Sequence, residues 1–195
     1  MTRFSFLTTL FLIAAPQCVL ADTSLYAEAA PADASFVRFI GFDGANEAEF
    51  DGFTFALNGD VGEAYIPVSA ALLKGTEPGR YVSVFRRADG EIRTITEGAR
   101  ASRSKVSLLM VNAGDTPVHL RLADGSVPVV EDVGPNSAAQ RDVNPVAISL
   151  GVFSDSAEAP LAVFDVALHR GQNLSFVVDA GSVRLIENQF APVAK

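Results

Sequence analysis

The sequence predicts an all-β protein made of two tandem small β-sandwich domains joined by a short linker. Short runs rich in Val, Ile, Phe and Thr recur along the chain, separated by Gly, Asp, Asn and Pro, which is typical of short antiparallel strands. Helix signals are scarce. Residues 98–104 are polar and without apolar periodicity, so we place a linker there between an N-terminal domain at 22–97 and a C-terminal domain at 105–195. A single larger sandwich with a crossover in mid-chain is the alternative.

The expected strands follow the apolar runs. In the N-terminal half they are Ser35–Phe42, Gly52–Leu57, Ala64–Val68, Arg80–Arg86 and Glu91–Thr96. In the C-terminal half they are Lys105–Asn112, Val118–Leu122, Val127–Glu131, Val146–Val152, Leu161–Leu168, Leu174–Val178 and Ser182–Ile186. Apolar residues take every second position of the Val118 strand, which predicts one buried and one solvated face. Asp89-Gly90 and Asp124-Gly125 are expected at turns, because Gly tolerates positive φ.

Residues 1–21 are expected to be a cleavable signal peptide. A basic residue, Arg3, precedes the apolar run Leu10–Ala15, and small Ala21 suits cleavage before Asp22. The run is too short to span a bilayer, which needs about 20 apolar residues. The mature chain is therefore expected to be exported and soluble.

Cys18 is the only cysteine and is expected to leave with the signal peptide. A lipid anchor on Cys18 is disfavoured, because Gln17 is too large and polar for that cleavage. The mature domains must then be stabilised without a disulfide, which a chain of this length can achieve with its apolar core. The net charge of −8 opposes nonspecific binding to nucleic acid.

The sequence holds no recognisable catalytic or metal-binding motif. Its two histidines, His119 and His169, have no partner at a metal-ligand spacing, and no serine occurs in a Gly-x-Ser-x-Gly elbow. Acidic residues also occur in close pairs, which are interpreted as solvated surface or turn positions: Glu47 with Glu49, Glu131 with Asp132, and Asp155 with Glu158. No catalytic residue, metal or cofactor is therefore predicted.

Basic residues gather around the expected linker. They are Arg80, Arg86, Arg87, Arg93, Arg100, Arg103 and Lys105, set against Asp89, Glu91 and Glu97. Such an excess of positive charge could dock an acidic protein or an anionic polysaccharide. The alternative is a set of solvated strand faces beside a hinge. Arg100 and Arg103 are kept as candidate partner-binding residues.

The second half of the chain resembles the periplasmic alginate O-acetylation proteins of the AlgF family. The stretch Arg141–Val146 carries most of this likeness, with Val130–Pro135 before it and Leu150–Phe153 after it. Residues 166–171 and the N-terminal Leu25-Tyr26 are similar to further family segments. Ala27-Glu28 stands where the family has Gly-Pro, and residues 41–50 also depart from the family pattern.

This resemblance implies a non-catalytic periplasmic adaptor in the O-acetylation of an exported polysaccharide such as alginate. Its implied partners are the periplasmic acetyltransferases and the membrane acyltransferase of the acetylation complex. Two other functions stay open: an acetyltransferase or esterase in its own right, and a carbohydrate-binding or cell-surface β module. An anionic polysaccharide is a further candidate partner, and nucleic acid is not.

Within the family-like stretch, Arg141, Asn144 and Pro145 are the candidate partner-binding residues. Residues 141–146 are expected to form a loop between two strands. Pro145 biases Asn144 towards extended backbone and stiffens the chain before the strand from Val146. Arg141 can pair with a carboxylate through two N–H groups, either within the protein or on a partner.

Overall fold

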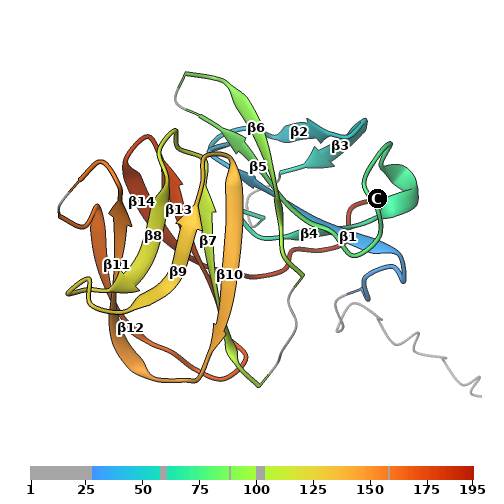
Figure 1. The fold of residues 1–195 in the computed structure, drawn as a ribbon. Helices are drawn as coiled ribbons and strands as arrows, with labels where there is room; N and C mark the ends of the chain where they lie inside the picture. The colour runs from blue at the N-terminus through green and yellow to red at the C-terminus, as the bar shows by residue number, and fades with distance from the viewer. Residues whose placement is uncertain (1–27, 58–60, 88, 100–103, 158) are drawn as a thin grey trace, which may run out of the picture.

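The computed structural model describes residues 28–57, 61–87, 89–99, 104–157 and 159–195 (Figure 1). The expected signal peptide, the mature start at Asp22 and the two candidates Arg100 and Arg103 lie outside these ranges. In the described part of the chain, no helix is long and apolar enough to cross a membrane.

The fold is all-β and consists of two tandem β-sandwich domains, as the sequence predicts. The strands of the first domain are β1 (Ala34–Ile40), β2 (Glu47–Phe50), β3 (Phe53–Ala56), β4 (Ile66–Ser69), β5 (Tyr81–Arg86) and β6 (Ile92–Glu97), with a short 3-10 helix η2 (Ala70–Leu72). The strands of the second are β7 (Val106–Asn112), β8 (Val118–Leu122), β9 (Pro128–Val133), β10 (Ser137–Val143), β11 (Ala147–Ser154), β12 (Ala162–Ala167), β13 (Asn173–Asp179) and β14 (Ser182–Glu187). The expected turns at Gly90 and Gly125 are confirmed, and both glycines have positive φ.

The first domain packs a four-stranded sheet, ordered β4-β1-β5-β6 and here called the N-terminal sheet, against the hairpin β2-β3. Alternation along β1 sends Val37 and Phe39 to the hairpin side, where the ring of Phe39 lies 5.1 Å from that of buried Phe55. The sequence does not predict β2, because the strand is short and two of its four residues are glutamates.

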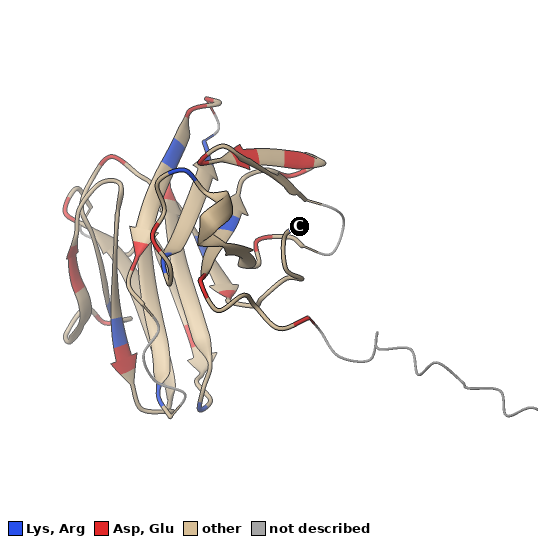
Figure 2. Cartoon of the chain, turned by 90° about the vertical axis from the view of Figure 1, so that its right-hand side faces the viewer, with Lys and Arg blue, Asp and Glu red and all other residues tan. Residues whose placement is uncertain are grey.

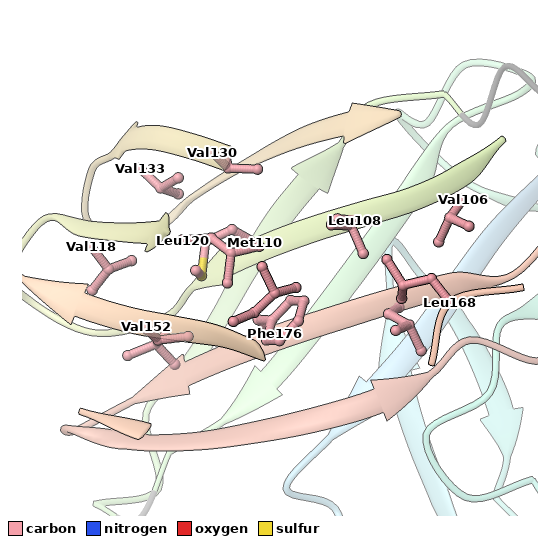
Figure 3. Close-up of a cluster of buried hydrophobic side chains, with 13 residues drawn as sticks. Val106, Leu108, Met110, Val118, Leu120, Val130, Val133, Val152, Leu168 and Phe176 are labelled. Carbon is pink, nitrogen blue, oxygen red and sulfur yellow. The ribbon is translucent and has the colours of Figure 1, made fainter. Parts of the chain in front are cut away.

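The second domain is a sandwich of two four-stranded sheets. The inner sheet has the order β10-β7-β13-β14, and the outer sheet has the order β12-β11-β8-β9. Figure 3 shows the core between them, where Leu108, Met110 and Phe176 of the inner sheet meet Leu120 and Val152 of the outer sheet. This core positions the strand ends and loops described below.

The sequence does not predict strand β10, and the expectation of a loop over residues 141–146 is wrong for residues 141–143, which belong to this strand. Its sequence, Ser-Ala-Ala-Gln-Arg-Asp-Val, has low β propensity. It pairs antiparallel with β7 along its whole length, from Ser137 with Asn112 to Val143 with Val106. Tertiary pairing therefore overrides local preference, and only residues 144–146 remain to connect β10 with β11.

The two domains meet through a buried apolar seam between the N-terminal sheet and the inner sheet. Ile40, Phe85 and Ile95 of the first domain pack with Leu109 and Val177 of the second. The inner sheet is thus covered on both faces, which explains why every residue of β7 is buried. The two domains therefore share a continuous apolar core at this seam.

At the polar end of the seam, the fully buried guanidinium of Arg38 joins both domains. Its Nη2 donates to Glu97 Oε1 at 2.8 Å and its Nε to Ser83 Oγ at 2.6 Å, both within the first domain. Its Nη1 donates to Ser175 Oγ at 3.1 Å and Asn188 Oδ1 at 2.8 Å, both from the second. A buried charge is tolerated only with such partners, so the cluster holds the domains in one relative position.

The C-terminal segment returns to the first domain. Residue Phe190 forms a parallel bridge with Tyr65, and the N–H groups of Ala191 and Ala194 donate to the carbonyl oxygens of Tyr65 and Pro67. This segment therefore runs beside β4 (Figure 1). The domain limits at residues 97 and 105 stay predictions, and most of the expected linker lies outside the described residues.

Candidate functional site

Arg141 projects from β10 across the open end of the sandwich towards β9. Its Nη1 donates to the carbonyl oxygens of Pro128 and Val129, both at 3.3 Å, and its side chain is exposed. The internal partner is thus a pair of backbone carbonyls rather than a carboxylate. Both bonds leave from one nitrogen, while a guanidinium carries five N–H donors in all, so this geometry can also present donors to solvent.

Asn144 and Pro145 lie in the short connection between β10 and β11, and both are exposed. Asn144 Oδ1 accepts a hydrogen bond of 2.6 Å from Lys105 Nζ at the start of β7. The backbone of the following residue, Val146, is fixed by the N–H of Leu168 at 3.0 Å. The connection therefore has a defined shape, as expected from the fixed φ of proline.

These residues border a shallow groove of about 470 Å³, here called the Arg141 groove. Its lining is mainly apolar and includes Leu122, Val127, Val129, Val143 and Ile148, with polar contributions from Lys105, Arg141, Asp142 and Asn144. Val127 is 49% exposed in the groove, and Val146, which follows Pro145 in the connection to β11, is 48% exposed. An apolar floor with fixed polar groups at its margin is the arrangement found at protein-binding surfaces.

The structure brings His119 and Asp155 together, although 36 residues separate them in sequence. Nδ1 of His119 accepts the N–H of Asp132 at 3.3 Å, so Nε2 carries the proton and donates to Asp155 Oδ1 at 2.6 Å. Sequence spacing could not reveal this pair. Over the described ranges, no three His, Cys, Asp or Glu side chains gather to hold a metal ion.

The basic residues near the expected linker are partly used within the protein. Arg87 and Arg93 both pair with exposed Asp115 of the β7-β8 connection, at 3.1 and 3.0 Å. Hydrogen bonds from Arg87, and then from Arg93, lower the pKa of Asp115. Because Asp115 belongs to the second domain, its pairs with Arg87 and Arg93 are interdomain contacts. Figure 2 shows that the Lys and Arg positions, in blue, are separated along the strands by acidic and uncharged positions. The role of Arg100 and Arg103 stays a prediction.

A family model and several curated proteins that are similar to this chain carry the same family name. The family model described as Alginate O-acetyl transferase AlgF matches residues 59–175. The alginate biosynthesis protein AlgF of Pseudomonas putida is 28% identical over 170 residues, covering 78% of this chain and 76% of that protein. The protein of the same name from Azotobacter vinelandii is 25% identical over 190 residues, covering 88% and 82%.

Among solved structures, the C-terminal domain of AlgF from P. aeruginosa is similar at 27% identity and a TM-score of 0.37, covering 44% of this chain and 97% of that one. The N-terminal domain of the same protein gives 16% identity and a TM-score of 0.34, covering 46% and 99%. The family model spans more than half of the sequence, and on that ground the chain belongs to the AlgF family.

Proposed function

We propose that this protein is a non-catalytic periplasmic adaptor in the O-acetylation of an exported polysaccharide such as alginate. It would bind the periplasmic acetyltransferases and the membrane acyltransferase of the acetylation complex. Family membership supports the pathway, because the relatives are named alginate biosynthesis proteins. The expected signal peptide supports the compartment.

The observation that carries the binding role is the Arg141 groove. Arg141 is held by two carbonyls and Asn144 by Lys105, so the polar groups at the margin are fixed before any partner arrives. Fixed groups lose little conformational entropy on binding. The exposed valines beside them offer apolar area to bury, and area of this kind is a main driving force of association.

The chemistry of the margin points to a partner that presents a carboxylate and an apolar side chain. Arg141 can bind a carboxylate through charge-assisted hydrogen bonds, and a nearby apolar side chain can cover Val127. An acidic residue beside an aliphatic residue on an acetyltransferase surface would meet both requirements. Lys105 adds positive charge at the same end of the sandwich.

Gene deletion tests the pathway role. The polymer should still be exported but should lack acetyl esters, as measured by proton NMR of the purified polysaccharide. Complementation with the intact gene should restore the esters, and complementation with Arg141→Ala should not. Normal acetylation in the deletion strain would refute the adaptor role.

A separate assay tests the alternative of intrinsic catalysis. Purified mature protein should leave an acetyl ester such as p-nitrophenyl acetate unhydrolysed above the rate of heat-denatured protein. Turnover that a single substitution abolishes would replace the adaptor with an enzyme.

A further inference from the structure

Strand β12 forms an open end of the outer sheet. It pairs antiparallel with β11 from Ala162 with Val152 to Ala167 with Ala147, and no described strand pairs with its other side. Leu168 donates its N–H to Val146 on the β11 side. The alternation of an antiparallel ladder then turns the backbone N–H and C=O groups of Val163, Asp165 and Ala167 away from β11.

The opposite end of the same sheet, β9, is closed in three ways. Pro128 begins the strand and has no N–H to offer. The pairing of β9 with β8 shifts register, and Asp132 has a φ of 55°. Arg141 occupies the carbonyl oxygens of Pro128 and Val129. Proteins block exposed edges with such devices, because an open edge recruits other strands.

Strand β12 carries none of these devices. Its sequence, Ala-Val-Phe-Asp-Val-Ala, contains no Pro, Gly or Lys, and its two valines and its phenylalanine favour extended backbone. Val163 is 49% exposed in the strand, and Asp165 is exposed and accepts a hydrogen bond from Ser149. The edge therefore offers backbone groups, an apolar side chain and one fixed carboxylate in a row.

The charge of the outer sheet indicates which kind of strand could pair with the free edge of β12. In the described residues of its four strands and of the β8-β9 and β11-β12 connections, a single Lys or Arg is present, Arg121, which pairs with Glu131 at 3.4 Å. Arg170 follows in the connection from β12 to β13. The carboxylates outnumber these two arginines: Asp124, Glu131, Asp132, Asp155 and Asp165. A strand that carries Lys or Arg opposite Asp165 would complement this field, since opposite charges stabilise cross-strand pairs.

We propose that the free edge of β12 binds an extended, basic segment of a partner protein as an added strand of the outer sheet. Main-chain hydrogen bonds to Val163, Asp165 and Ala167 would supply affinity, and a Lys or Arg opposite Asp165 would supply specificity. A second copy of this chain fits less well, because antiparallel pairing centred on Asp165 sets two carboxylates opposite each other. The inference deepens the adaptor proposal by adding a second surface, at the edge of the sheet opposite β9.

The test uses a short synthetic peptide that alternates Val with Lys, titrated into the full mature protein. The control peptides replace Lys by Glu or carry N-methyl groups that block one side of the peptide backbone. We expect NMR shift changes at β12, slower amide exchange at Val163, Asp165 and Ala167, and weaker binding at high salt. Equal binding of all three peptides, changes confined to β9, or no binding would overturn the proposal.

Charge reversal provides the matched variants. Asp165→Lys should abolish binding of the Lys peptide and create binding of the Glu peptide. Asp132→Lys makes the same charge change on the β9 side and should leave binding of the Lys peptide within about twofold. Loss of binding in both variants would indicate a general field effect and refute a site at β12. Dimerisation of the protein alone, abolished by Asp165→Lys, would assign the edge to a second copy instead.

These outcomes are distinct from failure of the adaptor role. Peptide binding is measured on the purified protein, whereas the adaptor role is measured by acetyl esters on the polymer. A protein that binds the Lys peptide at β12 but whose deletion leaves acetylation unchanged would retain the edge site and lose the proposed pathway.

Discussion

Two arginines, Arg38 and Arg141, occupy opposite extremes of environment in this protein. Arg38 is fully buried at the domain seam and is paired with a buried carboxylate and with side chains of both domains. Arg141 is exposed at the end of the sandwich and donates to the carbonyl oxygens of Pro128 and Val129. An arginine can therefore stabilise the domain interface, as Arg38 does, or remain available to bind a partner, as Arg141 does. The difference between the two residues is their burial.

The largest effect is expected from Arg38→Ala. The substitution leaves the Glu97 carboxylate buried without its cation, and breaking a buried pair in this way costs about 3–5 kcal/mol of unfolding free energy. Urea denaturation followed by circular dichroism measures the loss. Replacing both partners together, Arg38→Met with Glu97→Leu, should cost less than Arg38→Ala alone. A loss below about 1 kcal/mol for Arg38→Ala would show that the pair does not hold the seam.

A smaller effect is expected from Ser83→Ala in the same cluster. Ser83 accepts a hydrogen bond from Arg38 and donates one to Glu97, so alanine leaves two buried charged groups each short of one partner. Unsatisfied buried groups of this kind cost about 1–3 kcal/mol. Exposed Ser126→Ala is the control and should change the urea midpoint little. Equal effects of the two variants would contradict a special role for burial at the seam.

The exposed interdomain contact at Asp115 should contribute less to the free energy of unfolding than the buried Arg38 cluster does. It should contribute only at pH values where the Asp115 carboxylate is ionised. Its pKa lies below the usual value of 3.8, because Arg87 and Arg93 hydrogen-bond to the carboxylate. The folded state therefore binds this proton more weakly than the unfolded chain does. The contribution is fully present above pH 3.8 and is lost as the pH falls through the lower folded-state pKa.

Asp115→Asn tests this contribution through thermal melting at several pH values. The variant should melt slightly below the natural protein at neutral pH, and the difference should shrink as the pH falls below 3.8. Asp89→Asn serves as a control in a neighbouring turn. A difference that grows in acid would reverse the assigned sign.

The strands that sequence could predict are those whose own residues favour extended structure. Five of the seven residues of Val106–Asn112 are apolar, and the strand pairs on both sides within the inner sheet, so local preference and tertiary pairing agree. The polar strand β10 could not be predicted, since it forms only because β7 offers it an edge. The family-like residue Arg141 thereby moves from an expected loop to a strand.

The site was predictable in part. Asn144 and Pro145 lie in a connection, as expected, but the groove beside them requires β9 and β10 to meet, which no spacing in the sequence reveals. One feature of the sequence does point to the Arg38 cluster: Arg38 is a charged residue inside the otherwise apolar run Phe36–Ile40. Its partners Glu97 and Asn188 lie 59 and 150 residues away, so only the fold could identify them.

Binding of the Arg141→Ala variant to an acetyltransferase tests whether the Arg141 groove is the partner-binding surface. The purified periplasmic acetyltransferase of the same organism would be immobilised, and the natural protein, Arg141→Ala and the exposed-arginine control Arg80→Ala would be passed over it. Because Arg141 is exposed and its bonds are long, we expect a stability loss below about 1 kcal/mol together with loss of capture, while Arg80→Ala keeps both. Unchanged capture by Arg141→Ala, with unchanged melting, would contradict the assignment of the Arg141 groove as the partner-binding surface.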